Sequence, residues 1–127
     1  MKTHLLVVAA SACLAACATT DQVAMVEDGY QRGSLGVAAI ARGDWQAAEA
    51  SIQNSRMAEN EPARLINLGT VYMETGRPGM ALSAWRLALA SPNHEMVATA
   101  DGRWLSTREL AERALAKHEG AVRQATR

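Results

Sequence analysis

The chain is poor in the residues that most often carry chemistry or charge recognition. Its 127 residues include no phenylalanine, two cysteines and three histidines, and its formal net charge at pH 7 is zero. Because no basic cluster is present, we expect no nucleic-acid partner. His94 and His118 have no cysteine or histidine at ligand spacing, and no P-loop, dinucleotide fingerprint or nucleophile elbow occurs. We therefore expect no catalytic residues, no metal, no cofactor and no enzymatic activity.

The main apolar run lies at the N-terminus and is too short to span a membrane. It extends from Leu5 to about Ala16, whereas a spanning helix needs roughly 20 residues. Lys2 precedes the run and small residues follow it, as in a signal peptide. The run ends in Leu14-Ala15-Ala16-Cys17, which resembles the lipobox of bacterial lipoproteins. This resemblance implies a signal peptide over 1–16, a lipid on the thiol of Cys17, and a linker up to residue 28.

Two alternatives to lipidation at Cys17 stay open on the sequence. The first is an ordinary signal peptide cut at an Ala-x-Ala site, with Cys17 incidental. The second is lipidation at Cys13, although Ala10, three residues before it, is not the branched aliphatic residue that the lipobox favours. Ala18 follows Cys17, where an aspartate would favour the inner membrane. The resemblance therefore implies anchoring to the outer membrane, facing the periplasm.

An internal repeat follows the linker. Its matches lie at an offset of 33 residues and include glycines and bulky apolar positions. A constant offset over several such positions is the signature of a repeat architecture. The matched pairs are Leu35-Gly36 with Leu68-Gly69, Gly43 with Gly76, Ala48 with Ala81, Ile52 with Trp85, and Asn60 with Asn93.

The second copy resembles a tetratricopeptide repeat. The positions that carry the resemblance, and that would be structural in the family, are Leu68, Gly69, Tyr72, Ala81, Trp85 and Ala88. The first copy is weaker, with Ala39 in place of the tyrosine and Ser55 in place of the last alanine. The resemblance covers residues 29–95. It implies an all-α fold of two helical hairpins, a fragment of a right-handed α-solenoid.

Apolar periodicity places four helices near 29–42, 44–58, 62–75 and 78–91. One helical stripe, at spacings i, i+3, i+4 and i+7, consists of Leu65, Leu68, Gly69 and Tyr72. Gly69 on this stripe should allow the paired helix to approach closely. Three glycines weaken the first helix: Gly29, Gly33 and Gly36. A later start of that helix, near Arg32 or Ser34, is the alternative.

The segment 96–127 is expected to cap the repeats. Asp101-Gly102 suits a two-residue hairpin turn between short extended pieces within 97–105. Ser106 and Glu109 have the spacing of a capping box, which predicts a helix over 107–119 that stops at Gly120. Because terminal repeats cannot bury their faces alone, this helix should cover the second repeat.

The family resemblance implies a groove, lined by the first helix of each pair, that holds a protein or peptide partner. Carried over residue by residue, the groove positions are Val37, Ile40, Ile66, Thr70 and Met73. The family's carboxylate clamp uses lysine and asparagine. Asn67 is the one match and no groove lysine exists, so we reject this clamp. We expect Asn67 to satisfy backbone between helices instead.

The predicted function is a membrane-anchored, periplasm-facing adaptor for protein–protein interaction. A pilotin, or an assembly lipoprotein of a pilus or secretion system, is the alternative. An accessory to a cell-wall enzyme is a more distant one, with no residue that supports it.

Overall fold

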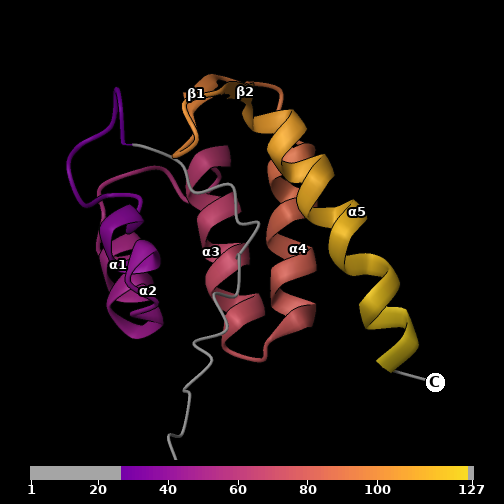
Figure 1. The fold of residues 1–127 in the computed structure, drawn as a ribbon. Coiled ribbons are helices and arrows are strands. Elements are labelled where there is room, and N and C mark those ends of the chain that lie inside the picture. Colours follow the sequence, from indigo (N-terminus) through magenta and orange to yellow (C-terminus); the bar gives the residue numbers. More distant parts are fainter. Residues whose placement is uncertain (1–26, 126–127) are drawn as a thin grey trace, which may run out of the picture.

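A computed structural model describes residues 27–125, so the predicted signal peptide, Cys17 and the linker up to residue 26 lie outside the described residues. The described part contains five helices and one antiparallel sheet of two strands (Figure 1). Their bounds are α1 Val37–Ala41, α2 Trp45–Gln53, α3 Pro62–Glu74, α4 Pro78–Leu89, β1 Met96–Ala98, β2 Trp104–Ser106 and α5 Thr107–Ala125. The prediction of an all-α fold is therefore confirmed for most of the described chain and corrected by the small sheet.

In both copies of the predicted repeat, the two helices are joined by the same kind of turn. Two residues after the first helix of each pair ends, the chain has a glycine with positive φ, 70° at Gly43 and 74° at Gly76. Two backbone hydrogen bonds then close each turn, in the pattern of a Schellman motif. These bonds run from Gly43 to Ile40 and from Asp44 to Ala39 in the first copy, and from Gly76 to Met73 and from Arg77 to Tyr72 in the second. Every partner in the second copy is thus the repeat equivalent of one in the first.

A second glycine allows close packing inside each pair. A Cβ atom on Gly36 would lie 3.1 Å from Cγ1 of Ile52, and one on Gly69 would lie 2.6 Å from Cδ1 of Trp85. Ile52 and Trp85 are themselves equivalent positions, and both are buried. The same contact therefore recurs in both copies, as the sequence predicted for Gly69.

The first helix is much shorter than predicted. It covers Val37–Ala41 rather than 29–42, and even the later start near Arg32 or Ser34 is wrong. Gly29, Gly33 and Gly36 all have positive φ, which a right-handed helix does not allow. The carboxylate of Glu27 accepts hydrogen bonds from the backbone N–H groups of Gly33 (2.6 Å) and Leu35 (3.0 Å). These residues consequently form consecutive turns in place of helix.

The second helix is also shorter than predicted, because α2 ends at Gln53 and not near residue 58. The hydroxyl of Ser55 donates to the carbonyl of Ile52 at 2.8 Å, which satisfies one of the carbonyls left free at the helix end. The predictions of 62–75 and 78–91 are close to the observed α3 and α4.

The predicted hairpin exists, but its turn differs from the prediction. Ala98 pairs with Trp104, and the backbone N–H of Thr99 donates to the carbonyl of Arg103 at 2.8 Å. Gly102, with φ at 80°, occupies the last position of a three-residue loop over 100–102. This geometry belongs to a hairpin loop with a glycine bulge rather than to a two-residue turn.

The C-terminal helix covers the second helical pair, as predicted, but it is longer than predicted. Its capping box forms, since the N–H of Glu109 donates to Oγ of Ser106 at 3.2 Å and the N–H of Ser106 to Oε2 of Glu109 at 3.0 Å. Figure 1 shows α5 alongside α4, and α5 also makes a smaller contact with α3. The helix does not stop at residue 119 but continues through Gly120 to Ala125.

Gly120→Ala should raise the free energy of unfolding by about 0.5–1 kcal/mol, because alanine is the better residue inside a helix. Nothing lies within 4 Å of a Cβ at this position, and Gly120 is absent from the positive-φ glycines. Gly76→Ala is the matched control: its Cβ would also meet nothing within 4 Å, but its φ of 74° is left-handed, so this variant should lose stability. Both values come from urea unfolding followed by circular dichroism. Loss of stability in Gly120→Ala would mean that the helix ends there.

Candidate functional site

The structure separates the five predicted groove residues into two groups. Ile40 and Ile66 belong to the core, with exposed fractions of 7% and 5%. They cannot contact a partner docked on the surface, so their assignment to an open groove is corrected. Val37, Thr70 and Met73 keep partly exposed side chains on α1 and α3 and stay candidates for partner contact.

All three remaining groove residues have contacts within the fold, and Val37 packs against the core cluster that contains Leu35. The hydroxyl of Thr70 donates to the carbonyl of Ile66 at 3.2 Å, one turn earlier in α3. Met73 packs against the cluster of Trp85 and Leu115, which Val122 near the end of α5 also contacts. The C-terminal part of α5 thus packs against the same cluster as Met73.

Asn67 is a structural residue. It is buried, and its side-chain amide donates to the carbonyl of Leu35 at 2.8 Å. This bond joins α3 to the turn before α1 and satisfies a carbonyl that no helix bond uses. The prediction that Asn67 satisfies backbone between elements is confirmed.

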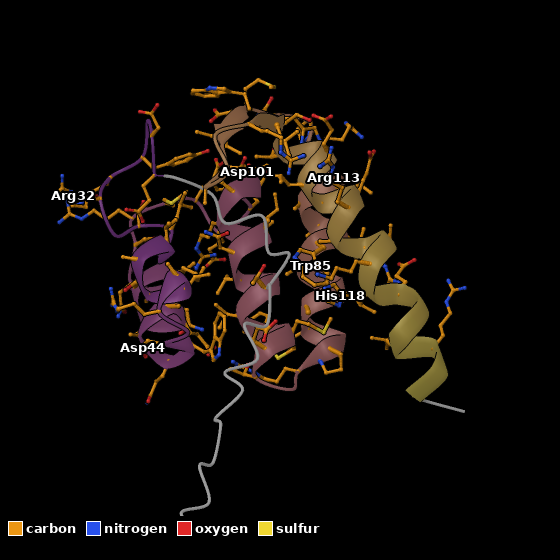
Figure 2. All side chains as sticks on the ribbon, in the orientation of Figure 1. Arg32, Asp44, Trp85, Asp101, Arg113 and His118 are labelled. Carbon is orange, nitrogen blue, oxygen red and sulfur yellow. The ribbon has the colours of Figure 1, made fainter. Side chains whose placement is uncertain are left out.

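Trp85 is the central anchor of the second helical pair. Its side chain is 2% exposed, and its indole Nε1 donates to the carbonyl of Ile66 at 3.1 Å. The imidazole of His118 on α5 stacks on the indole, with ring centroids 5.2 Å apart and planes inclined by 26° (Figure 2). One side chain thus joins α3, α4 and α5.

Partial burial against Trp85 lowers the pKa of His118, and the charge of Lys117 adds to this effect. Because the folded state favours neutral imidazole, stability should fall as the pH drops below about 7, through the unfolded pKa near 6.5 and towards the lower folded pKa. His118→Gln should lose part of this pH dependence, since glutamine does not titrate. Thermal melts of both proteins at a series of pH values provide the test. Identical pH profiles for the two proteins would show that His118 does not contribute.

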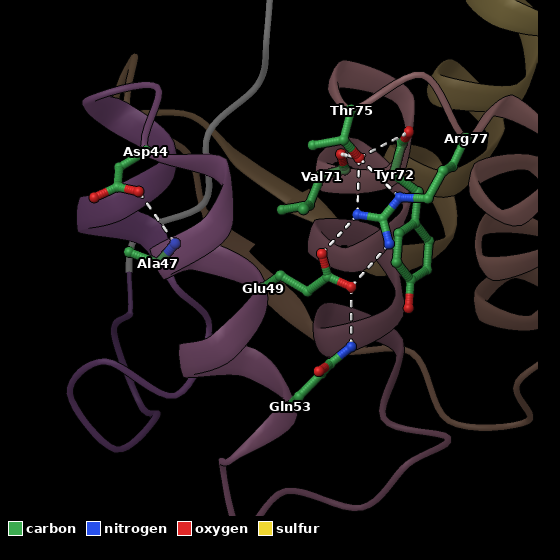
Figure 3. Close-up of polar contacts among 8 residues, drawn as sticks. All are labelled: Asp44, Ala47, Glu49, Gln53, Val71, Tyr72, Thr75 and Arg77. Carbon is green, nitrogen blue, oxygen red and sulfur yellow. Dashed lines mark hydrogen bonds and ion pairs between the residues drawn. The ribbon is translucent and has the colours of Figure 1, made fainter.

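A polar bridge that sequence reasoning missed joins the two helical pairs (Figure 3). Two guanidinium nitrogens of Arg77 bond to the two carboxylate oxygens of Glu49, at 3.0 and 2.6 Å. Arg77 also donates to the hydroxyl of Thr75 and lies over the ring of Tyr72, 4.6 Å from its centroid. The hydrogen bond to Arg77 lowers the pKa of the Glu49 carboxyl. Such bidentate geometry fixes orientation, so the bridge sets the position of α2 against the α3–α4 turn.

The exposed large apolar side chains of the described residues form two pairs. Met80 and Leu87 lie two turns apart on the outer face of α4. Met96 and Trp104 lie on β1 and β2, at exposed fractions of 56% and 58%. From the sequence, we expect both Trp104 and Leu105 to pin the start of the C-terminal helix. Leu105 is buried as expected, but Trp104 is exposed, because the hairpin register decides which face each side chain occupies.

Within residues 27–125 the structure contains no group of three metal-binding side chains, and no helix there has the length and apolarity to cross a membrane. Comparison with protein-family models, curated proteins and solved structures finds no match to this chain.

Proposed function

We propose that this protein is a lipid-anchored adaptor that faces the periplasm and holds a protein partner through two repeats of the tetratricopeptide type. The recurrence of contacts at the repeat offset is the observation that carries the repeat assignment. Gly36 against Ile52, and Gly69 against Trp85, are equivalent contacts. The turns after them use equivalent hydrogen bonds. Repeats of this type stack their units to bury a shared core and present a surface for partners.

The anchor rests on Cys17. Its lipobox resemblance implies three acyl chains, and two or more chains hold a protein stably on a membrane. The alanine at position 18 favours the outer membrane. An anchored domain meets membrane-bound partners without diffusing through the periplasm, which suits an adaptor.

Partner contact is assigned to the surface of Val37, Thr70 and Met73. Val37 and Met73 are apolar and each is partly exposed. A short surface of this kind draws its affinity from a few apolar anchors rather than from a network of charges. Added salt should therefore have little effect on a complex formed there.

A photo-crosslinking amino acid at position 70 tests the proposed surface in cells. We expect a discrete cross-linked species in the membrane fraction, and mass spectrometry identifies its second component. The matched control carries the same amino acid at Glu112, an exposed position on α5. Absence of any species at position 70, or the same species at both positions, would contradict partner binding at this surface.

A further inference from the structure

The chain enters the described fold beside the hairpin. Tyr30, three residues after the first described residue, donates its hydroxyl to Oε2 of Glu95 at 3.1 Å, immediately before β1. Burial, together with the charges of Glu61 and Glu95, raises the pKa of the Tyr30 phenol far above its usual range, so the phenol keeps its proton. Tyr30 also packs against the core cluster that contains Val97 and Leu105. The N-terminal side of the fold is thus fixed next to the hairpin.

The hairpin has one buried face and one exposed apolar face. Val97 pairs with Leu105, and both side chains are buried in the core. Alternation along each strand places Met96, Ala98 and Trp104 on the opposite face. The pairing of Ala98 with Trp104, and of Met96 with Ser106, makes Met96 and Trp104 diagonal neighbours. We call these three side chains the outer hairpin face.

The charges at the hairpin tip are paired. Nε of Arg103 contacts Oδ2 of Asp101 at 2.6 Å, and the hydroxyl of Thr99 also donates to Asp101. The outer hairpin face therefore carries no excess of basic charge that would select anionic lipids. Tryptophan, with an apolar body and one N–H donor, is the side chain typical of the interface between lipid and water.

We propose that the outer hairpin face rests in the interfacial region of the bilayer that holds the lipid anchor, a proposal that rests on the anchor at Cys17. Nine residues, 18–26, separate Cys17 from the described fold, so the distance from Cys17 to residue 27 is at most about 36 Å. An anchored chain therefore keeps its hairpin end close to the membrane. The contact would orient the repeats relative to the membrane.

Met80, another exposed apolar side chain, does not share this position. Met80 lies in the first turn of α4, next to the α3–α4 turn. Figure 1 shows this turn at the opposite end of the molecule from the hairpin. A short linker beside the hairpin thus favours lipid contact for Met96 and Trp104 over contact for Met80.

Tryptophan quenching by brominated lipids tests the proposal. The lipidated protein, purified from membranes, is reconstituted into phosphatidylethanolamine and phosphatidylglycerol vesicles that contain dibrominated phosphatidylcholine. We expect the emission of Trp104, taken as wild type minus Trp104→Ala, to be largely lost. Trp85 is buried, and Trp45 follows Asp44, which lies at the end away from Asp101 (Figure 2). Replacement of phosphatidylglycerol by phosphatidylcholine should leave the quenching unchanged.

A matched control places a tryptophan at the start of α4, as Met80→Trp in the Trp104→Ala protein. Met80 is 48% exposed and lies next to the α3–α4 turn, away from the hairpin. This variant should float with vesicles and escape quenching. Equal quenching at position 80, or a wild-type protein that floats without quenching of Trp104, overturns the hairpin contact and leaves the anchor intact. A wild-type protein that does not float with the vesicles overturns both the anchor and the contact.

Discussion

Trp85→Ala should lower the free energy of unfolding by about 3–5 kcal/mol, the usual loss for a large buried aromatic side chain. The indole is 2% exposed, bonds to the carbonyl of Ile66 and supports the stack with His118. Gly69 leaves the space that the ring fills, and alanine at 85 cannot fill it. Because small domains have only about 5–15 kcal/mol of stability in total, the variant should be close to unfolding. Urea unfolding followed by circular dichroism measures the change.

Trp104→Ala is the control for this measurement. It removes the same side chain from a position that is 58% exposed, so its effect should stay within about 0.5 kcal/mol. An unchanged unfolding curve for Trp85→Ala, or equal losses in the two variants, would contradict the packing of the second helical pair around Trp85.

Cys17→Ala should release the protein from the membrane fraction, because the acyl chains supply the main attachment. The apolar run before it is too short to replace a spanning helix. Two apolar hairpin side chains are a weak attachment compared with two or more acyl chains. Cell fractionation followed by immunoblotting should find the wild type in membranes and the variant in the soluble periplasmic fraction.

Cys13→Ala is the matched control, since it removes the other cysteine of the same segment. It should leave the protein in the membrane fraction. If Cys13→Ala releases the protein from the membrane fraction and Cys17→Ala does not, the lipidated residue is Cys13. Membrane retention of both single variants and of the double variant would contradict lipid anchoring altogether.

The sequence predicted the second helical pair well because local signals and tertiary packing agree there. Gly76 and Pro78 mark the observed end of α3 and start of α4. Trp85 falls in the core, as expected for a structural position of the repeat, and Asn67 bonds to backbone, as expected when the carboxylate clamp was rejected. The capping box of Ser106 and Glu109 is equally local and forms as predicted.

The first helix and the end of α5 could not be predicted in the same way. Glycine permits both a weak helix and a left-handed turn, and the carboxylate of Glu27 stabilises the turns around Gly33. At Gly120 the opposite outcome occurs, because Val122 packs against the cluster of Trp85 and extends α5. In both places, the conformation of the glycine depends on contacts made by other residues, Glu27 near Gly33 and Val122 near Gly120.

The candidate surface depends even more on tertiary packing. Helical periodicity cannot tell which apolar residues of α1 and α3 become buried, and Ile40 and Ile66 join separate core clusters. The bridge between Glu49 and Arg77 joins residues 28 positions apart, beyond any local spacing rule. The exposure of Trp104 follows from the hairpin register, which the three-residue loop sets.

Mass spectrometry of the N-terminal peptide, taken from protein extracted from membranes, tests the lipid anchor most directly. We expect a mature chain that begins at Cys17, with a diacylglyceryl group on its thiol and an acyl chain on its amino group. A mature chain that begins at any other residue, or a Cys17 with an unmodified thiol, would contradict the proposal of a lipid-anchored adaptor.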